Sequence, residues 1–277
     1  MQLREVDVFC TGPFTGNGLA VVHGADSLAT EQMQALARWT QFSETAFLLE
    51  PTDPAADYRV RIFTPVTEYP FAGHPTLGSA HAWLEAGGVP GDPDTVVQEC
   101  GIGRVPVRRA GGTLAFAAPE RTRTGPVDEA ELTEVCAALG LAEDDVVAHA
   151  WGSNGPQWCL LELRDAEVVR AVEGSLVGTD LRVGLVGLEA GEGAQGEGDI
   201  AYVVRALTPH HEDGATGSLN ASVAQWMRER GRVPGRYAVA QGGQVGRAAR
   251  LEVHDDGQQV WIGGRCVTRV TGELHFG

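Results

Sequence analysis

The sequence predicts a mixed α/β (α+β) protein made of two pseudo-symmetric domains. Three observations support this prediction. The 277 residues suffice for two domains of ordinary size. A segment of the first half recurs in the second half, and each copy is typical of a strand followed by a loop and a helix. We expect a first domain at residues 1–125 and a second at 126–277, with the last strand free to return to the first half.

The recurring segment places residues 58–68 over residues 202–212, at a constant offset of 144 residues. Between position 58 and position 73, seven residues are identical to their partners. Coincidence in a Gly- and Val-rich chain is the alternative, but the offset is close to half the chain length, which favours two halves of one kind. We expect a pseudo-twofold axis that relates residues near 58–87 to those near 202–231, with Thr64-Pro65 and Thr208-Pro209 in equivalent places.

The first copy has clear strand and helix signals. Residues 58–63 alternate as a half-buried strand does. A loop at 68–74 precedes Pro75, which suits the first turn of a helix, and Gly87-Gly88 ends that helix.

In the second copy, Ser218 is the expected N-cap of a helix that ends at Gly231. We expect residues 119–126 to be the domain linker and residues 190–198 to be a flexible surface loop. The other expected helices are residues 30–40, with Thr30 as cap, and residues 129–139, ending at Gly140. The other expected strands are residues 6–9, 19–22, 47–49, 157–163, 183–188 and 260–262.

The charge excludes several classes of partner. The net charge is −16 and no long basic run is present, so binding to nucleic acid or to an anionic membrane surface is not expected. Residues 1–10 carry Arg4, Glu5 and Asp7 and are too polar for a signal peptide. No apolar run approaches the ~20 residues of a membrane helix. We expect a cytoplasmic protein.

Five cysteines are present, an odd number at irregular spacing. Without an export signal, this pattern favours reduced cytosolic thiols. No CxxC pair occurs, so a structural zinc site is not expected.

Two loop-to-helix junctions stand at equivalent places, at Gly73-His74 and at Gly217-Ser218. A helix N-terminus presents free N–H groups and the positive end of the helix dipole, which attract carboxylate or phosphate. Glycine lets the backbone approach a ligand closely. Two such ends facing each other across a cleft would bind a small anion.

Three residues near these junctions suit proton transfer. Glu44 precedes an apolar strand, where desolvation can raise the pKa of a carboxyl group, although a structural carboxylate at a strand end fits equally well. His74 fits an N-cap, a substrate contact or a base. Asp213 ends the run His210-His211-Glu212-Asp213, in which consecutive ligands could not easily face one metal ion.

Ordered motifs from residue 7 to about residue 247 cover nearly the whole chain, and together they resemble the PhzF family, named for phenazine biosynthesis. The motifs are Asp7-Val-Phe9, Phe14-Thr-Gly-Asn-Gly-Leu-Ala-Val-Val22, Ser43-Glu-Thr-Ala-Phe47, Arg61-Ile-Phe-Thr-Pro65, Glu68-Tyr-Pro-Phe-Ala-Gly-His-Pro-Thr-Leu-Gly78, Glu212-Asp-Gly-Ala-Thr-Gly-Ser218, Gln241-Gly242 and Val245-Gly246-Arg247.

The resemblance implies a diaminopimelate-epimerase-like fold, in which each of two similar domains wraps a sheet around a central helix and the active site lies between them. It implies a cofactor-free isomerase that acts on a small carboxylate, and a homodimer. By this resemblance the catalytic residues are Glu44, His74 and Asp213. The residues that contact the substrate are Asn17, Gly73, Gly217 and Ser218.

The chain departs from the family pattern in three places. Asp213-Gly214 replaces a common Asp-Pro, and Gln41-Phe42 replaces a common Asn-Leu. The phenazine enzyme carries an N-terminal histidine near its substrate, whereas the first histidine here is His23. We therefore expect a small cyclic or unsaturated amino-acid-like carboxylate from a biosynthetic, secondary-metabolite pathway, without specifying the compound.

Other functions were weighed against this one. A cysteine-pair racemase needs a thiol from each half, but neither helix junction contains cysteine, and Cys100 has Gln244 as its partner 144 residues later. A cysteine-independent epimerase remains an alternative. A non-catalytic binding protein also remains, although three candidate proton-transfer residues disfavour it.

We expect neither a metal nor an organic cofactor. A GxGxxG pattern at Gly191, Gly193 and Gly196 lies in an acidic loop and precedes a strand-like run, whereas a dinucleotide site requires a helix there. The chain contains no lysine, which excludes a P-loop and a pyridoxal Schiff base.

Overall fold

The computed structural model describes residues 1–189 and 198–276 and comprises two compact units. Unit 1 consists of Met1–Ala117 and Gly263–Gly277, and unit 2 consists of Ala118–Ile262. The C-terminal strand thus belongs to unit 1. The expected boundary after residue 125 separates two homologous halves of the sequence, and it stays a prediction. Within the described part of the chain, no helix is long and apolar enough to cross a membrane.

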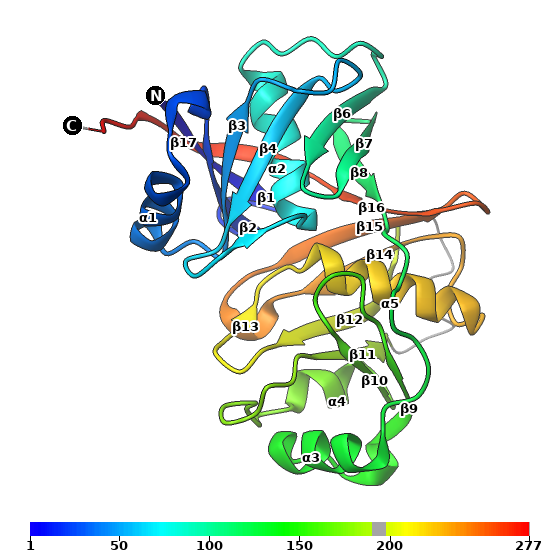
Figure 1. The fold of residues 1–277 in the computed structure, drawn as a ribbon. Coiled ribbons are helices and arrows are strands. Elements are labelled where there is room, and N and C mark those ends of the chain that lie inside the picture. The colour runs from blue at the N-terminus through cyan, green and yellow to red at the C-terminus, as the bar shows by residue number, and fades with distance from the viewer. Residues whose placement is uncertain (190–197, 277) are drawn as a thin grey trace. The chain divides into compact units, whose positions relative to one another are not determined.

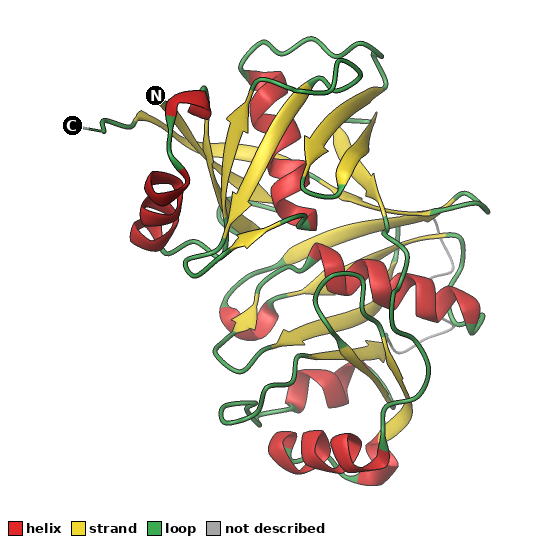
Figure 2. Cartoon of the chain, in the orientation of Figure 1, coloured by secondary structure: helices red, strands yellow, loops and turns green. Residues whose placement is uncertain are grey.

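Among the described residues, unit 1 combines two α-helices with a set of strands, and unit 2 combines three α-helices with a set of strands (Figures 1 and 2). The elements assigned to unit 1 are β1 (Gln2–Val8), β2 (Asn17–Val22), α1 (Thr30–Thr40), β3 (Thr45–Leu49), β4 (Tyr58–Phe63), β5 (Glu68–Tyr69), α2 (Gly73–Glu85), β6 (Thr95–Cys100), β7 (Gly103–Ala110), β8 (Thr113–Ala117) and β17 (Cys266–Glu273). Those of unit 2 are α3 (Glu129–Leu139), β9 (Val146–Trp151), β10 (Cys159–Leu163), α4 (Ala166–Ala171), β11 (Val183–Leu188), β12 (Ile200–Leu207), β13 (Glu212–Asp213), α5 (Gly217–Glu229), β14 (Arg236–Gln241), β15 (Ala249–Asp255) and β16 (Val260–Gly264), whose last two residues return to unit 1.

The two units share one order of strand pairing. In unit 1, β1–β2 is antiparallel, β2–β3 parallel, β3–β4 antiparallel, β4–β6 parallel and β6–β7 antiparallel. In unit 2, β9–β10, β10–β11, β11–β12, β12–β14 and β14–β15 repeat these directions in the same sequence. The duplication read from the sequence is therefore a duplication of topology.

The offset of 144 residues is kept at the level of single hydrogen bonds. Thr64 follows β4, and its amide donates to the carbonyl of Thr67 at 2.8 Å; the Thr208 amide donates to the carbonyl of His211 at 3.0 Å. Each threonine hydroxyl also accepts from the amides of the two residues that follow the proline. The two Thr-Pro turns are equivalent, and helices α2 and α5 each span 13 residues at the same offset.

Helix α2 is enclosed by the strands of unit 1, as Figure 1 shows. It contacts β1, β2, β3, β4, β6, β7, β8 and β17. The enclosure requires small side chains, because a Cβ atom at Gly78 would lie 2.5 Å from Cδ2 of Leu19. In unit 2, Leu219 of α5 similarly approaches β11, where a Cβ at Gly184 would lie 2.3 Å from its Cδ1. The predicted sheet around a central helix is confirmed.

Most expected elements are present, with ends shifted by up to four residues. The predicted cap of α1 was wrong. Ala29, not Thr30, is the N-cap of α1, because the Ala29 amide donates to the Gln32 side chain at 2.9 Å and the helix starts at Thr30. The Thr30 hydroxyl instead accepts from Arg61 at 3.1 Å. The proposed linker at 119–126 lies in unit 2 and forms one isolated bridge, Arg123 to Ser153.

The proposed surface loop at 190–198 falls almost entirely outside the described residues, and so do Gly191, Gly193 and Gly196 of the GxGxxG pattern.

The duplication supplies a matched pair of ion pairs. Arg61–Glu68 (2.7 Å) has side chains that are 27% and 39% exposed, whereas Arg205–Glu212 (2.8 Å) has side chains that are 6% and 10% exposed. Arg205 also donates to the carbonyls of Val169 and Val172. The same pair is thus solvated in unit 1 and buried in unit 2.

We predict that Glu212→Gln lowers the free energy of unfolding by about 3 kcal/mol, because it leaves a buried guanidinium without its counter-charge. Glu68→Gln should lower it by at most about 1 kcal/mol, the scale for an exposed pair. Urea denaturation of both variants at pH 7 measures the difference. Equal losses would contradict the assignment of different burial to the two pairs.

Candidate active site

Glu44 and His74 come together in unit 1. Glu44 lies just before β3, and His74 is the second residue of α2. Glu44 Oε2 is 3.5 Å from His74 Nε2, and the two side chains are 15% and 5% exposed. A mostly buried carboxylate beside a buried imidazole is an arrangement suited to moving protons.

The imidazole of His74 is neutral at physiological pH. Burial lowers the pKa of His74 to about 3, because the apolar interior disfavours the charged ring. The ring therefore keeps one N–H donor and one acceptor nitrogen.

Asn17 is the first residue of β2. Its Oδ1 lies 3.4 Å from the hydroxyl of Ser43, the neighbour of Glu44 in the chain. The loop that precedes Asn17 is held by Asp7, whose carboxylate accepts from the amides of Phe14 (2.7 Å) and Gly16 (2.8 Å). The sequence motif containing Asp7 was recognised, but this anchoring role was not.

Asp213 lies in β13 of unit 2, and its orientation is fixed by hydrogen bonds. The Thr216 hydroxyl donates to Asp213 Oδ2 at 2.7 Å. Gln241 then donates to the Thr216 hydroxyl at 2.9 Å and to the Asp213 carbonyl at 3.0 Å, while its oxygen accepts from the Thr216 amide at 3.0 Å. Asn220 donates to the same oxygen at 2.8 Å. Sequence reasoning missed Thr216 and Asn220, since buried polar partners carry no periodic signal.

Ser218 is the second residue of α5, so the prediction that it is the N-cap was wrong. Thr216 holds that position because Gly217 already has helical geometry. The Trp158 indole donates to Ser218 Oγ at 3.3 Å. A hydroxyl that accepts one hydrogen bond keeps its own hydrogen to donate elsewhere.

Gly73 and Gly217 are the first residues of α2 and α5. The N-cap residues are Ala72 and Thr216, and in the described chain neither side chain caps its helix. The amides of each first turn are therefore not used by a cap and can bind an anion. Four of the predicted site residues lie in unit 1: Asn17, Glu44, Gly73 and His74. The other three lie in unit 2: Asp213, Gly217 and Ser218.

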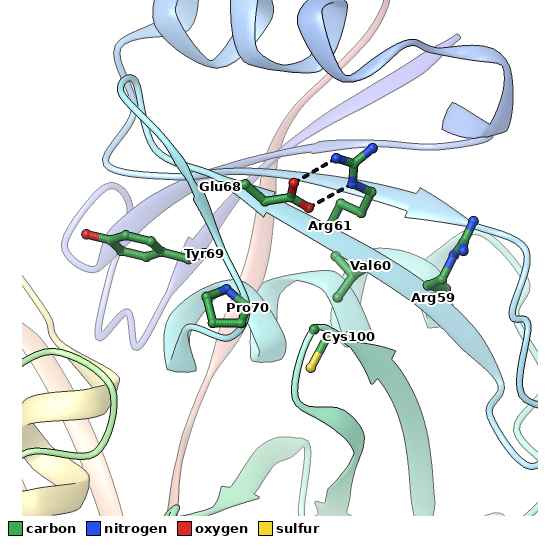
Figure 3. A pocket seen from close by; sticks show the side chains of 8 residues that line it. Arg59, Val60, Arg61, Glu68, Tyr69, Pro70 and Cys100 are labelled. Atoms are coloured by element: carbon green, nitrogen blue, oxygen red, sulfur yellow. Dashed lines mark hydrogen bonds and ion pairs between the residues drawn. The ribbon is translucent and has the colours of Figure 1, made fainter. Parts of the chain in front are cut away.

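A separate hollow in unit 1 does not coincide with these residues. Figure 3 shows this cavity of about 430 Å³, lined by Arg59, Val60, Arg61, Glu68, Tyr69, Pro70, Cys100 and Gly101. The bidentate pair Arg61–Glu68 occupies its upper edge in that view. No predicted site residue lines it, so the candidate site rests on side-chain geometry and not on this cavity.

The phenazine biosynthesis-like family, PhzC-PhzF, matches residues 6–272 of the chain. The chain belongs to this family. Antisense-enhancing sequence 1 of Schizosaccharomyces pombe is 31% identical to it, over 98% of each chain. The trans-2,3-dihydro-3-hydroxyanthranilate isomerase of Pseudomonas aeruginosa is 30% identical, over 91% of this chain and 89% of the relative.

Solved structures agree with this assignment. A predicted epimerase of Pseudomonas aeruginosa superposes with a TM-score of 0.81 at 27% identity and covers 100% of this chain and 99% of its own. A probable proline racemase of Agrobacterium radiobacter has the same fold, with a TM-score of 0.60 at 14% identity over 100% and 93% of the chains. The protein is a PhzF-like isomerase with a diaminopimelate-epimerase-like fold.

The thiols of this PhzF-like isomerase are poorly suited to a cysteine-pair mechanism. Burial raises the pKa of Cys10, of Cys100 and of Cys266, and it raises the pKa of Cys159 to about 12. The thiolate is the reactive form, so raised pKa values disfavour proton abstraction by sulfur at pH 7. Among the described residues, no cluster of three His, Cys, Asp or Glu side chains could hold a metal.

We predict that His74 makes stability depend on pH. Its pKa is about 3 when folded and about 6.5 when unfolded, so between these values the unfolded chain binds one more proton. Stability should therefore be fully present above pH 6.5 and fall as the pH is lowered. Between pH 7 and pH 5 the loss due to His74 should be about 2 kcal/mol.

The measurement is the free energy of unfolding of wild type and His74→Asn at both pH values. His23, whose pKa burial lowers to about 4, titrates in both proteins and cancels in the comparison. Equal pH dependence in the two proteins would show that His74 is not a buried neutral imidazole.

Proposed function

We propose that this isomerase shifts a C–H proton on a small cyclic or unsaturated amino-acid-like carboxylate, without a metal or organic cofactor, in a biosynthetic, secondary-metabolite pathway. The observation that carries the proposal is the close approach of Glu44 to the buried, neutral His74. An isomerase of this kind removes a proton from one carbon and delivers it to another. One partly desolvated carboxylate can do both.

The roles follow from the contacts of each group. Glu44 is the base in the first step and the acid in the second, and the neighbouring His74 positions a polar substrate group or relays a second proton. We propose that the substrate carboxylate is held by the unused first-turn amides at Gly73 and Gly217 and by the Ser218 hydroxyl. Asp213, fixed by Thr216, would position a polar substrate group. Each unit offers one such helix start, at equivalent places of the duplicated topology.

The named relative suggests the first compound to assay, trans-2,3-dihydro-3-hydroxyanthranilate. It is a cyclic, unsaturated amino acid and so belongs to the proposed class. Because no histidine precedes His23, related cyclic amino acids belong in the same panel. Incubation in D₂O distinguishes the possibilities: an isomerase places deuterium at a new carbon, an epimerase replaces hydrogen at the original carbon, and a binding protein does neither.

We predict that Glu44→Gln lowers turnover by at least ~10²-fold, because the amide keeps the shape of the side chain but has no basic oxygen. Substrate affinity and melting temperature should change little. Glu50→Gln is the matched control, since it makes the same change at the exposed end of β3. Steady-state kinetics and thermal melting are measured on each purified variant. Near-normal turnover of Glu44→Gln on a true substrate would reject the mechanism.

We also propose a cytoplasmic homodimer, as the family resemblance implies. Light scattering at micromolar concentration should then give about twice the chain mass of 29.3 kDa. A particle of single-chain mass across that concentration range would reject the dimer and leave the proposed chemistry untouched.

A further inference from the structure

The hairpin loop between β9 and β10 carries a buried amide beside the start of α5. The Gly152 amide closes the loop by donating to the Trp158 carbonyl at 2.9 Å. The Ser153 amide ties the loop to a preceding segment by donating to the Arg123 carbonyl at 3.1 Å. Asn154 sits in this loop and is only 8% exposed. The backbone contacts hold it in place from both sides.

One hydrogen bond decides which way the amide of Asn154 points. Its Nδ2 donates to the carbonyl of Ser218 at 2.9 Å. A carbonyl oxygen accepts and does not donate, so the nitrogen must face Ser218 and Oδ1 must occupy the other arm of the planar group. The acceptor Oδ1 is thereby held one amide group away from the carbonyl of Ser218, the second residue of α5.

Oδ1 of Asn154 is buried and, within the described residues, has no hydrogen-bond donor. Most buried polar atoms of native proteins have a partner, and one without it carries the cost of lost solvation. Sequence analysis did not select Asn154, because the family motifs do not include it. A ligand with an N–H group would satisfy the oxygen.

The chemistry around Asn154 defines that ligand further. The neighbouring Ser218 keeps its hydroxyl hydrogen to donate, since the Trp158 indole already donates to its oxygen. The first-turn amides of α5 also donate. The start of α5 therefore offers hydrogen-bond donors to a carboxylate. Asn154 Oδ1 adds one acceptor, which requires a hydrogen-bond donor on the ligand.

We propose that Asn154 Oδ1 accepts a hydrogen bond from the amino group of the substrate, so that Asn154 and Ser218 together select acids that carry an N–H next to the carboxylate. The inference rests on the proposed function, which places the carboxylate at the start of α5. It makes Asn154 a specificity-determining residue. A purely structural Asn154 would use only Nδ2, to tie the loop to the helix.

Two probes of equal shape test this: anthranilate, and 2-methylbenzoate, in which a methyl group replaces the amino group. By titration calorimetry, wild type should bind anthranilate roughly ten-fold more tightly, the ratio that one hydrogen bond to a buried acceptor supports. In Asn154→Leu the ratio should fall to within about two-fold, because the acceptor is gone.

Two further variants make the readout independent of stability. Asn154→Asp removes the donor to Ser218 but keeps an acceptor, so both affinities should fall while anthranilate stays preferred. Ser222→Ala is the control. It removes a different buried polar group, a hydroxyl without a partner in the described chain that lies one turn further along α5 than Ser218. This change should leave the ratio of the two affinities unchanged. If Asn154→Leu does not fold, the wild-type and Asn154→Asp ratios decide.

The outcomes separate the two proposals. Equal binding of both acids by wild type, or a parallel loss of both affinities in Asn154→Leu, would overturn the role of Asn154 and leave the carboxylate site standing. Binding of neither acid by wild type at millimolar concentration would reject the proposed carboxylate site, and the role of Asn154 with it.

Discussion

Helix α2 is covered on its sides by strands, and this enclosure limits both its composition and its use. Nine of its residues, from Gly73 to Ala80 together with Ala82, are buried. Because strands surround the sides of the helix, a ligand can approach it only at one of its ends. The N-terminal end offers amides that, in the described chain, the N-cap side chain does not use, and a favourable dipole for an anion. The packing of the core thus determines which few residues of the helix can take part in chemistry.

Duplication gave the protein two such helix starts, and their side chains have diverged. The residue at the second helical position is His74 in unit 1 and Ser218 in unit 2, and the short strand before the helix carries Tyr69 in one and Asp213 in the other. Hydrogen bonds of the Thr-Pro turns have not changed. One backbone therefore presents a neutral imidazole in one place and a hydroxyl with a fixed carboxylate in the other, which is how a symmetric fold acquires an asymmetric set of reactive groups.

Much of this could be predicted from the sequence because it depends on local pattern. The alternation in β4 and the end of α3 before Gly140 are read from neighbouring residues. The offset of 144 residues is read by comparing two short segments of the sequence. Strands β6, β7, β14 and β15 were not assigned, although β6 pairs with β7 and β14 with β15, their neighbours along the chain. In β7 the strand pattern is interrupted by Pro106, a residue that disfavours strands. The cap at Thr216 was missed for a different reason: the buried hydrogen bonds that hold Thr216 come from Gln241, 25 residues later.

The motifs found Glu44 and His74, but the charge state of His74 follows only from its burial. A cationic histidine at 3.5 Å would stabilise the carboxylate and make it a weaker base. Burial lowers the pKa of His74 to about 3 and prevents this at pH 7. The imidazole can still offer a hydrogen bond, so it can position Glu44 without neutralising it. A carboxylate that must first take and then return a proton needs this kind of neighbour, because a fixed positive charge would favour one half of the reaction at the expense of the other.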